Sequence, residues 1–169
     1  GEILGAQGVG IEGVDKRIDV IATAMRGGIT APELADLELA YAPPLGSAKD
    51  PVNMLGYVAE NVVSGLSEVA QWHEIDEYRE NGYELLDVRS VEECGRGIIP
   101  GAINIPVDEI RARYSELTNK NLLVNCQVGL RGHTGSMLLK ELGFNAVNLD
   151  GGYLTWINSP AGQTIEIMN

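Results

Sequence analysis

The sequence has few basic residues and no long apolar run. Its 169 residues include 12 Lys and Arg against 24 Asp and Glu, which gives a formal net charge of −12. Binding to nucleic acid or to an anionic membrane depends on clustered basic side chains, so this composition argues against both partners. No apolar run approaches the roughly 18–20 residues of a membrane-spanning helix, and no basic-then-apolar signal segment stands at the N-terminus.

Cysteine is also scarce, because Cys94 and Cys126 are the two in the chain. Two cysteines are too few for a disulfide framework, so we expect a cytoplasmic protein with free thiols and no bound metal. With 44% hydrophobic and 21% charged residues, the composition is that of a globular protein. The chain starts at Gly1 without an initiator Met and apparently within a strand, so we expect a fragment of a longer polypeptide.

The segment around Cys126 carries the most specific chemistry. Leu122–Val124 is an apolar run typical of a strand, and apolar spacing typical of a helix starts at Arg131. Cys126 therefore lies where a strand ends and a helix begins, and the free N–H groups of a helix start favour an anion. Gly129 permits a turn with positive φ, and Arg131 adds a positive charge. The pattern predicts a site that holds a sulfur anion.

A second motif, Gly8-Val-Gly-Ile-Glu-Gly13, matches the G-x-G-x-x-G pattern of dinucleotide sites and precedes a helical pattern. Glu33 follows at about the distance of a ribose ligand. A dinucleotide site also needs further parallel strands, and residues 26–65 offer none. The pattern therefore disfavours dinucleotide binding here.

Periodicity and capping signals divide the chain into two parts. The first part predicts a strand over 2–11 and helices over 14–25, 30–37 and 50–64. The second part predicts strands over 84–88, 102–105, 122–124 and 145–149, and helices over 74–81, 136–142 and 152–157. Strands that alternate with helices indicate an α/β fold with a parallel sheet, whose site lies at the carboxyl ends of the strands.

Three stretches of the first part, 3–7, 14–22 and 39–53, resemble the C-terminal dimerisation domain of flavin-dependent pyridine nucleotide–disulfide oxidoreductases, in particular the coenzyme A-disulfide reductase branch. The resemblance implies a truncated α+β dimerisation segment over 1–64 and a homodimeric parent enzyme that uses FAD, NAD(P)H and coenzyme A. None of these cofactors is expected on this fragment alone. Tyr41 matches a tyrosine that reaches towards the partner's redox cysteine, although chemistry alone favours a packing role for it.

The second part contains four motifs: Leu86–Glu93, Gly97–Pro106, Cys126-x-x-Gly129-x-Arg131 and Leu149–Trp156. Together they resemble a single rhodanese-type sulfurtransferase domain over residues 72–158. The resemblance implies a three-layer domain with a central parallel sheet, after a linker over 65–71 and before a tail over 159–169. An isoleucine, Ile98, stands where a histidine is usual, and Cys94 where an aromatic is common.

The resemblance implies that Cys126 carries a sulfane sulfur as a persulfide and that Arg131 assists it. The sulfur would be exchanged with small-molecule or protein thiols and persulfides. His133 as a base and Cys94 as a resolving thiol are the weaker alternatives for those residues. The other implied residues are the anion-binding loop (Gln127, Val128, Gly129, Leu130 and Gly132) and a buried charge network (Asp87, Arg89 and Glu93).

Two other classes of function compete with this interpretation. Cysteine-dependent phosphatases carry Cys-x5-Arg, whereas this loop is Cys126-x4-Arg131, a shorter ring that suits a single sulfur atom. A non-catalytic dimerisation or interaction module is the other alternative, although such degenerate domains often lack the cysteine. The sequence therefore favours a sulfurtransferase that is part of a flavin-dependent coenzyme A-disulfide or persulfide reductase.

Overall fold

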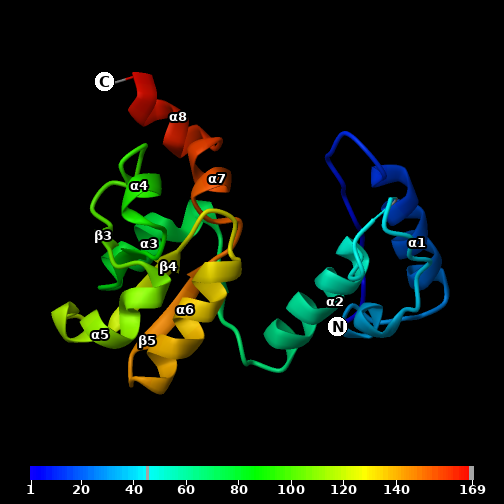
Figure 1. Ribbon diagram of the computed structural model, residues 1–169, viewed down its shortest axis with the longest axis horizontal. Coiled ribbons are helices and arrows are strands. Elements are labelled where there is room, and N and C mark those ends of the chain that lie inside the picture. The colour runs from blue at the N-terminus through cyan, green and yellow to red at the C-terminus, as the bar shows by residue number, and fades with distance from the viewer. Residues whose placement is uncertain (45, 168–169) are drawn as a thin grey trace. The chain divides into compact units, whose positions relative to one another are not determined.

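The computed structural model describes residues 1–44 and 46–167, with side chains to residue 163, and these form two compact units (Figure 1). The first unit is Gly1–Leu66 and the second starts at Ser67. The first contains α1 (Val14–Arg26), the 3₁₀ helix η1 (Pro32–Asp36) and α2 (Pro51–Val63).

The first unit is held together by a small core between its helices. Ile21 and Ala24 of α1 pack with Leu34 of η1 and Val52 of α2. The start of α2 is fixed by Asp50, whose carboxylate accepts a hydrogen bond from the Val52 N–H at 3.0 Å. Arg17 of α1 pairs with that same carboxylate at 2.8 Å. The ion pair therefore joins the two long helices beside the apolar core.

The predicted strand over 2–11 is not a strand in the structure. Its residues are extended but have no hydrogen-bonded neighbour strand among the described residues. Leu4, Val9 and Ile11 are 86%, 94% and 101% exposed. A strand exists only as part of a ladder, so the expectation failed for want of a pairing partner. The predicted helix after Thr30 is present as the short helix η1.

The second unit contains a five-stranded, all-parallel sheet in the order β1-β5-β4-β2-β3. This confirms the predicted α/β fold with a central parallel sheet. The strands are β1 (Val69–Ala70), β2 (Glu84–Asp87), β3 (Ile103–Asn104), β4 (Asn121–Asn125) and β5 (Asn145–Leu149). The helices are η2 (Trp72–Glu74), α3 (Ile75–Glu80), α4 (Val91–Cys94), η3 (Val107–Glu109), α5 (Ile110–Arg113), η4 (Tyr114–Glu116), α6 (Leu130–Glu141), α7 (Gly152–Ile157) and α8 (Pro160–Ile167).

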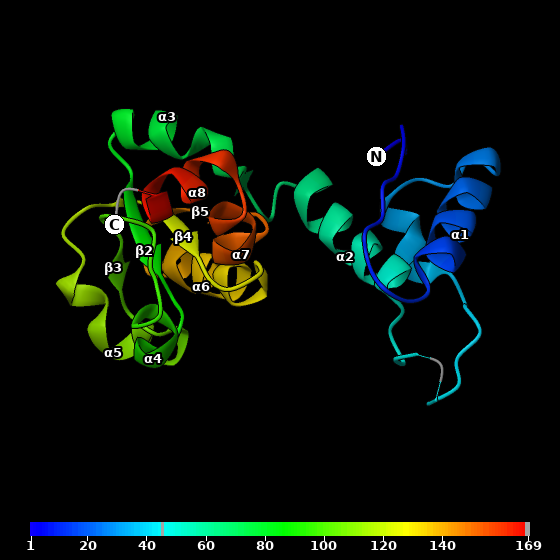
Figure 2. The same ribbon diagram turned by 90° about the horizontal axis from the view of Figure 1, so that it is seen from above.

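Alternate residues of the central strand β4 pack on opposite faces of the sheet. Leu122 and Val124 belong to a core that includes residues of α5 and α6. Leu123 belongs to a second core that includes residues of α3 and α7. Figures 1 and 2 show these helices flanking the sheet. The two cores make three layers, and they fix β4 and therefore the loop that follows it.

Several element bounds differ from the sequence expectations. Strand β1 lies inside the stretch expected to be a linker, where its two residues pair with β5. Helix α6 begins at Leu130, six positions before the predicted start. The expected tail contains α8, and residues 168–169 of that tail lie outside the described residues. In the described part of the chain no helix is long and apolar enough to cross a membrane.

Candidate functional site

Cys126 directly follows β4 at the carboxyl edge of the sheet, as the sequence predicts. It is 1% exposed, and its Sγ accepts a hydrogen bond from the Gly129 N–H at 3.1 Å. Gly129 has a φ of 113° and precedes the first residue of α6. A side chain at that position would strain the backbone. The turn therefore brings an N–H group to the sulfur, and the start of α6 lies beside it.

The carbonyl side of the same loop is held by the start of α7. The Tyr153 N–H donates to the Cys126 carbonyl at 2.7 Å, and the Leu154 N–H donates to the Gln127 carbonyl at 3.0 Å. Gly152 makes this approach possible, because a Cβ there would lie 2.4 Å from the Cys126 carbonyl oxygen. These bonds engage two loop carbonyls with α7, while the Gly129 N–H of the same loop donates to the sulfur.

Arg131 and Glu93 form an ion pair beside the loop. The two guanidinium nitrogens Nη1 and Nη2 each donate to a Glu93 carboxylate oxygen at 2.7 Å. These bonds, together with one from the Ser90 N–H, lower the pKa of Glu93 from 4.5 to about 2. The pKa of Arg131 is raised, mainly by Glu93 and to a smaller extent by Cys126. Arg131 therefore lies near the sulfur with its charge already compensated.

Asp87 and Arg89 form a second, fully buried pair. The closest contact joins Arg89 Nη2 to Asp87 Oδ2 at 2.7 Å, and both residues are at most 1% exposed. The Arg89 Nη1 also donates to the side chain of Gln127 at 3.3 Å. Its guanidinium stacks on the Tyr153 ring at 4.0 Å. The pair thus supports both the loop and α7 from inside the domain.

The other three candidate residues are His133, Cys94 and Tyr41, and each has different surroundings. His133 Nδ1 lies 3.1 Å from the Ser67 hydroxyl. Burial and the nearby Asp87 raise the pKa of Cys94 to about 11, so its thiol stays protonated at neutral pH. Tyr41 belongs to the first unit and is 55% exposed. Among the described residues no group of three or more His, Cys, Asp or Glu side chains could hold a metal ion.

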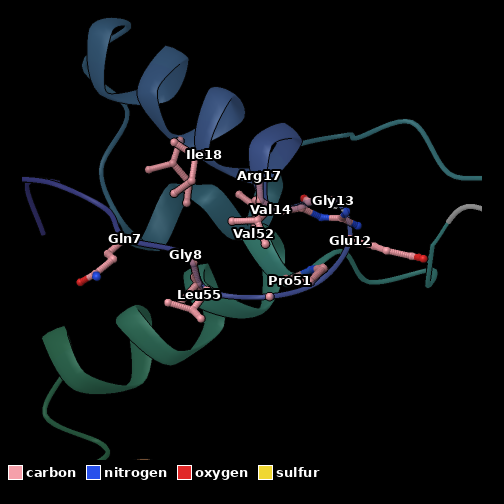
Figure 3. A pocket seen from close by; sticks show the side chains of 13 residues that line it. Gln7, Gly8, Glu12, Gly13, Val14, Arg17, Ile18, Pro51, Val52 and Leu55 are labelled. Atoms are coloured by element: carbon pink, nitrogen blue, oxygen red, sulfur yellow. Dashed lines mark hydrogen bonds between the residues drawn. The ribbon is translucent and has the colours of Figure 1, made fainter.

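The G-x-G-x-x-G stretch of the first unit lines a pocket of about 380 Å³ (Figure 3). The pocket is largely apolar, with Ile18 and Leu55 in its wall, and its Arg17 is already paired with Asp50. Glu33, the expected ribose ligand, instead accepts hydrogen bonds from the backbone and hydroxyl of Thr30. The described residues of this unit therefore do not fit a dinucleotide.

Sequence reasoning missed several groups that surround the cysteine loop. The backbone N–H groups of α7 that bind the loop cannot be identified from side-chain types. The pair Gly151-Gly152 is the one sequence sign that the backbone there lies close to another segment. Asn148 was also missed, and a Cβ on Gly132 would lie 2.3 Å from its Oδ1. Asn125, next to the cysteine, is fully buried, and its side-chain amide has no hydrogen-bond partner in the part of the chain that the structure describes.

Glu93→Gln tests the ion pair through its pH dependence. The pKa of Glu93 is depressed in the folded protein, so its contribution to stability is complete above about pH 4.5 and is lost as the pH falls towards 2. We expect the variant to be less stable than the wild type by about 1 kcal/mol at pH 6, as partly exposed pairs are. The difference should shrink towards pH 2 in urea titrations. Glu80→Gln, on an exposed face of α3, is the control. A difference that does not change with pH would contradict the assignment.

Comparison with known proteins places this geometry in a family. Residues 68–159, more than half of the chain, match the rhodanese-like domain. A coenzyme A disulfide reductase of Staphylococcus aureus (strain bovine RF122 / ET3-1) is 54% identical over 59 residues, which are 35% of this chain and 14% of that protein. The chain thus spans about a seventh of the length of this curated relative.

Two solved structures resemble most of the chain. Reduced CoADR-RHD of Bacillus anthracis matches with a TM-score of 0.83 and 50% identity over 86% of this chain and 26% of that one. An NAD-dependent persulfide reductase from A. fulgidus matches with a TM-score of 0.77 and 42% identity over 87% of this chain and 26% of that one. The similarity extends beyond the residues that match the domain family.

Proposed function

The chain belongs to the rhodanese-like domain family, and on this premise we propose that Cys126 is the sulfur carrier of a sulfurtransferase. The observation that supports this most directly is the Gly129 N–H at 3.1 Å from Sγ, in a loop whose carbonyls are bound by α7. Preorganised donors stabilise an anion without reorganisation during the reaction. The free N–H groups at the start of α6 add to this effect.

In the proposed reaction the Cys126 thiolate attacks the outer sulfur of a donor. A new S–S bond forms on the protein, the donor's S–S bond breaks, and the leaving group departs with the electron pair. A second nucleophile, such as an acceptor thiol, then removes the outer sulfur and regenerates the thiolate, which is covalent catalysis in two steps. Arg131, although paired with Glu93, assists by its charge near the sulfur, and the loop N–H groups of residues 127–131 hold the terminal sulfur.

We further propose that the parent enzyme is a flavin-dependent coenzyme A-disulfide or persulfide reductase. The names of the similar proteins support this, since they include a coenzyme A disulfide reductase and an NAD-dependent persulfide reductase. FAD and NAD(P)H have no fitting site on the described residues of the first unit, so no step here passes through them. Coenzyme A enters as the thiol of a substrate.

The first unit is proposed to take part in a homodimer of the parent. Its exposed apolar residues support this, because Leu4, Val9 and Ile11 are almost fully solvent-accessible. Sedimentation of the parent enzyme as a monomer would contradict the proposal. Tyr41 is proposed to contribute across the dimer to the redox site. Unchanged disulfide reduction by the Tyr41→Phe parent would contradict that role.

The sulfurtransferase proposal is tested on the chain itself by mass spectrometry. The reduced protein is incubated with thiosulfate or with a persulfide of coenzyme A, desalted and weighed intact. We expect a gain of one sulfur atom, located to the Cys126 peptide and removable by cyanide. A chain that gains no sulfur from any sulfane donor would support a non-catalytic interaction module instead. Hydrolysis of a phosphate ester would support a phosphatase-like site.

A further inference from the structure

The cysteine loop carries two exposed apolar side chains. Val128 and Leu130, on either side of Gly129, are 59% and 68% exposed, whereas Cys126 is 1% exposed. Both side chains belong to the turn whose Gly129 N–H donates to Sγ, so a donor that reaches the sulfur is expected to contact them. Large apolar side chains at a binding site commonly interact with apolar parts of the ligand.

The same loop has no uncompensated positive charge from the arginines near it. Arg131 gives both terminal nitrogens to Glu93 at 2.7 Å, and Arg89 is buried against Asp87. Residues 127–130 contain no Lys or Arg, and the chain has a net charge of −12. A dianion such as thiosulfate therefore meets a thiolate beside an arginine whose charge Glu93 already balances. Like charges repel more strongly in a partly desolvated site than in water.

We propose that Val128 and Leu130 form an apolar collar that selects organic persulfides over thiosulfate. This inference rests on the proposed sulfur transfer. In the selected donor, R–S–SH, the methylene groups next to the sulfur lie on the two side chains. The Cys126 thiolate takes the terminal SH, giving Cys126–S–SH, and the electron pair of the broken bond leaves on R–S⁻. The leaving group carries one negative charge, whereas thiosulfate releases sulfite with two.

The test measures single-turnover sulfur loading from two donors, thiosulfate and the persulfide of N-acetylcysteamine, whose arm is neutral. For the wild type we expect a second-order rate constant about 100-fold higher with the persulfide, the discrimination that a few apolar contacts can give. Leu130→Lys supplies a cation and removes part of the collar. It should raise the thiosulfate rate and lower the persulfide rate, each by about tenfold.

Two further variants separate charge from contact. Val128→Ser with Leu130→Ser removes the apolar surface without adding charge, and should reduce the preference for the persulfide by about tenfold. Thr118→Lys is the charge control. Its site is exposed, and the neighbouring Asn119 side chain donates to the Gly82 carbonyl ahead of β2, at the amino edge of the sheet. This variant should keep the wild-type ratio of the two rates.

The outcomes distinguish the collar from the sulfurtransferase function. Loading from neither donor would overturn the proposed function itself. Loading from both donors at similar rates, or a ratio that the Leu130 and Val128 variants do not change, would overturn the collar alone. A change of the ratio in Thr118→Lys equal to that in Leu130→Lys would show a general charge effect and would also overturn it. Circular dichroism of each variant verifies that the fold is intact.

Discussion

Cys126→Ser is expected to lower the rate of sulfur loading by at least about 10³-fold, the loss typical of a missing nucleophile. Serine is close in size to cysteine, and the Gly129 N–H that donates to Sγ in the wild type remains in place. The loop geometry should therefore survive. The hydroxyl is a weak nucleophile without a base, and the structure places His133 Nδ1 against the Ser67 hydroxyl. The mass gain of one sulfur should disappear.

The matched control for this variant is Cys94→Ser. The pKa of the Cys94 thiol is raised to about 11, so it is a poor source of thiolate at neutral pH. The control should load sulfur at a rate close to that of the wild type. Undiminished sulfur loading of Cys126→Ser would show that Cys126 is not the sulfur carrier. Loss of loading in Cys94→Ser alone would indicate that Cys94 carries the sulfur instead.

Asp87→Asn is expected to destabilise the second unit by about 3–5 kcal/mol, because it leaves a buried arginine without its counter-charge. Arg89 is 1% exposed, and three of its side-chain contacts go to Asp87. Its remaining polar partners, Gln127 and Gly97, supply neutral oxygens. The two tryptophans of the chain, Trp72 and Trp156, both lie in this unit. Tryptophan fluorescence in urea therefore reports the stability of the second unit.

Two comparisons make this prediction specific to the buried charge. Asp87→Asn combined with Arg89→Met removes the charge that was left alone, and should regain more than half of the lost stability. Glu116→Gln breaks an exposed pair with Arg113 on the same unit, and should leave the unfolding midpoint close to that of the wild type. If Asp87→Asn alone were as stable as the wild type, the buried charge of Arg89 would not need Asp87 as its counter-charge.

The main fold and the position of the cysteine were predictable because they follow from local patterns. The apolar run of β4 and the helix after it are short-range signals, and together they place Cys126 at the carboxyl edge of the sheet. The pairing of Glu93 with Arg131 joins residues far apart in the sequence, so no periodicity could indicate it. Helix α4 is four residues long, which is too short for a periodic signal, although Ser90 and Glu93 form its capping box.

The failed expectation of a strand in the first unit has a different physical cause. Alternation and β-branched residues make residues 2–11 compatible with a strand, but a strand also requires a neighbour, which composition does not reveal. The G-x-G-x-x-G motif has the same weakness, because its meaning depends on the strands around it. In the structure Gly8 and Gly10 lie against Val14, Gly13 lies against Arg17, and the loop lines an apolar pocket.

The bonds from α7 to the cysteine loop determine when the site can first exist during synthesis. The ribosome adds about 5–20 residues per second and domains fold as units from the N-terminal side, so Cys126 is made before Tyr153 and Leu154. Until those two amides are available, the Cys126 and Gln127 carbonyls lack their partners. A nascent chain that stops short of α7 therefore exposes a cysteine in an unformed loop. Under the proposed function, sulfur transfer at Cys126 therefore requires that β5 and α7 have been translated.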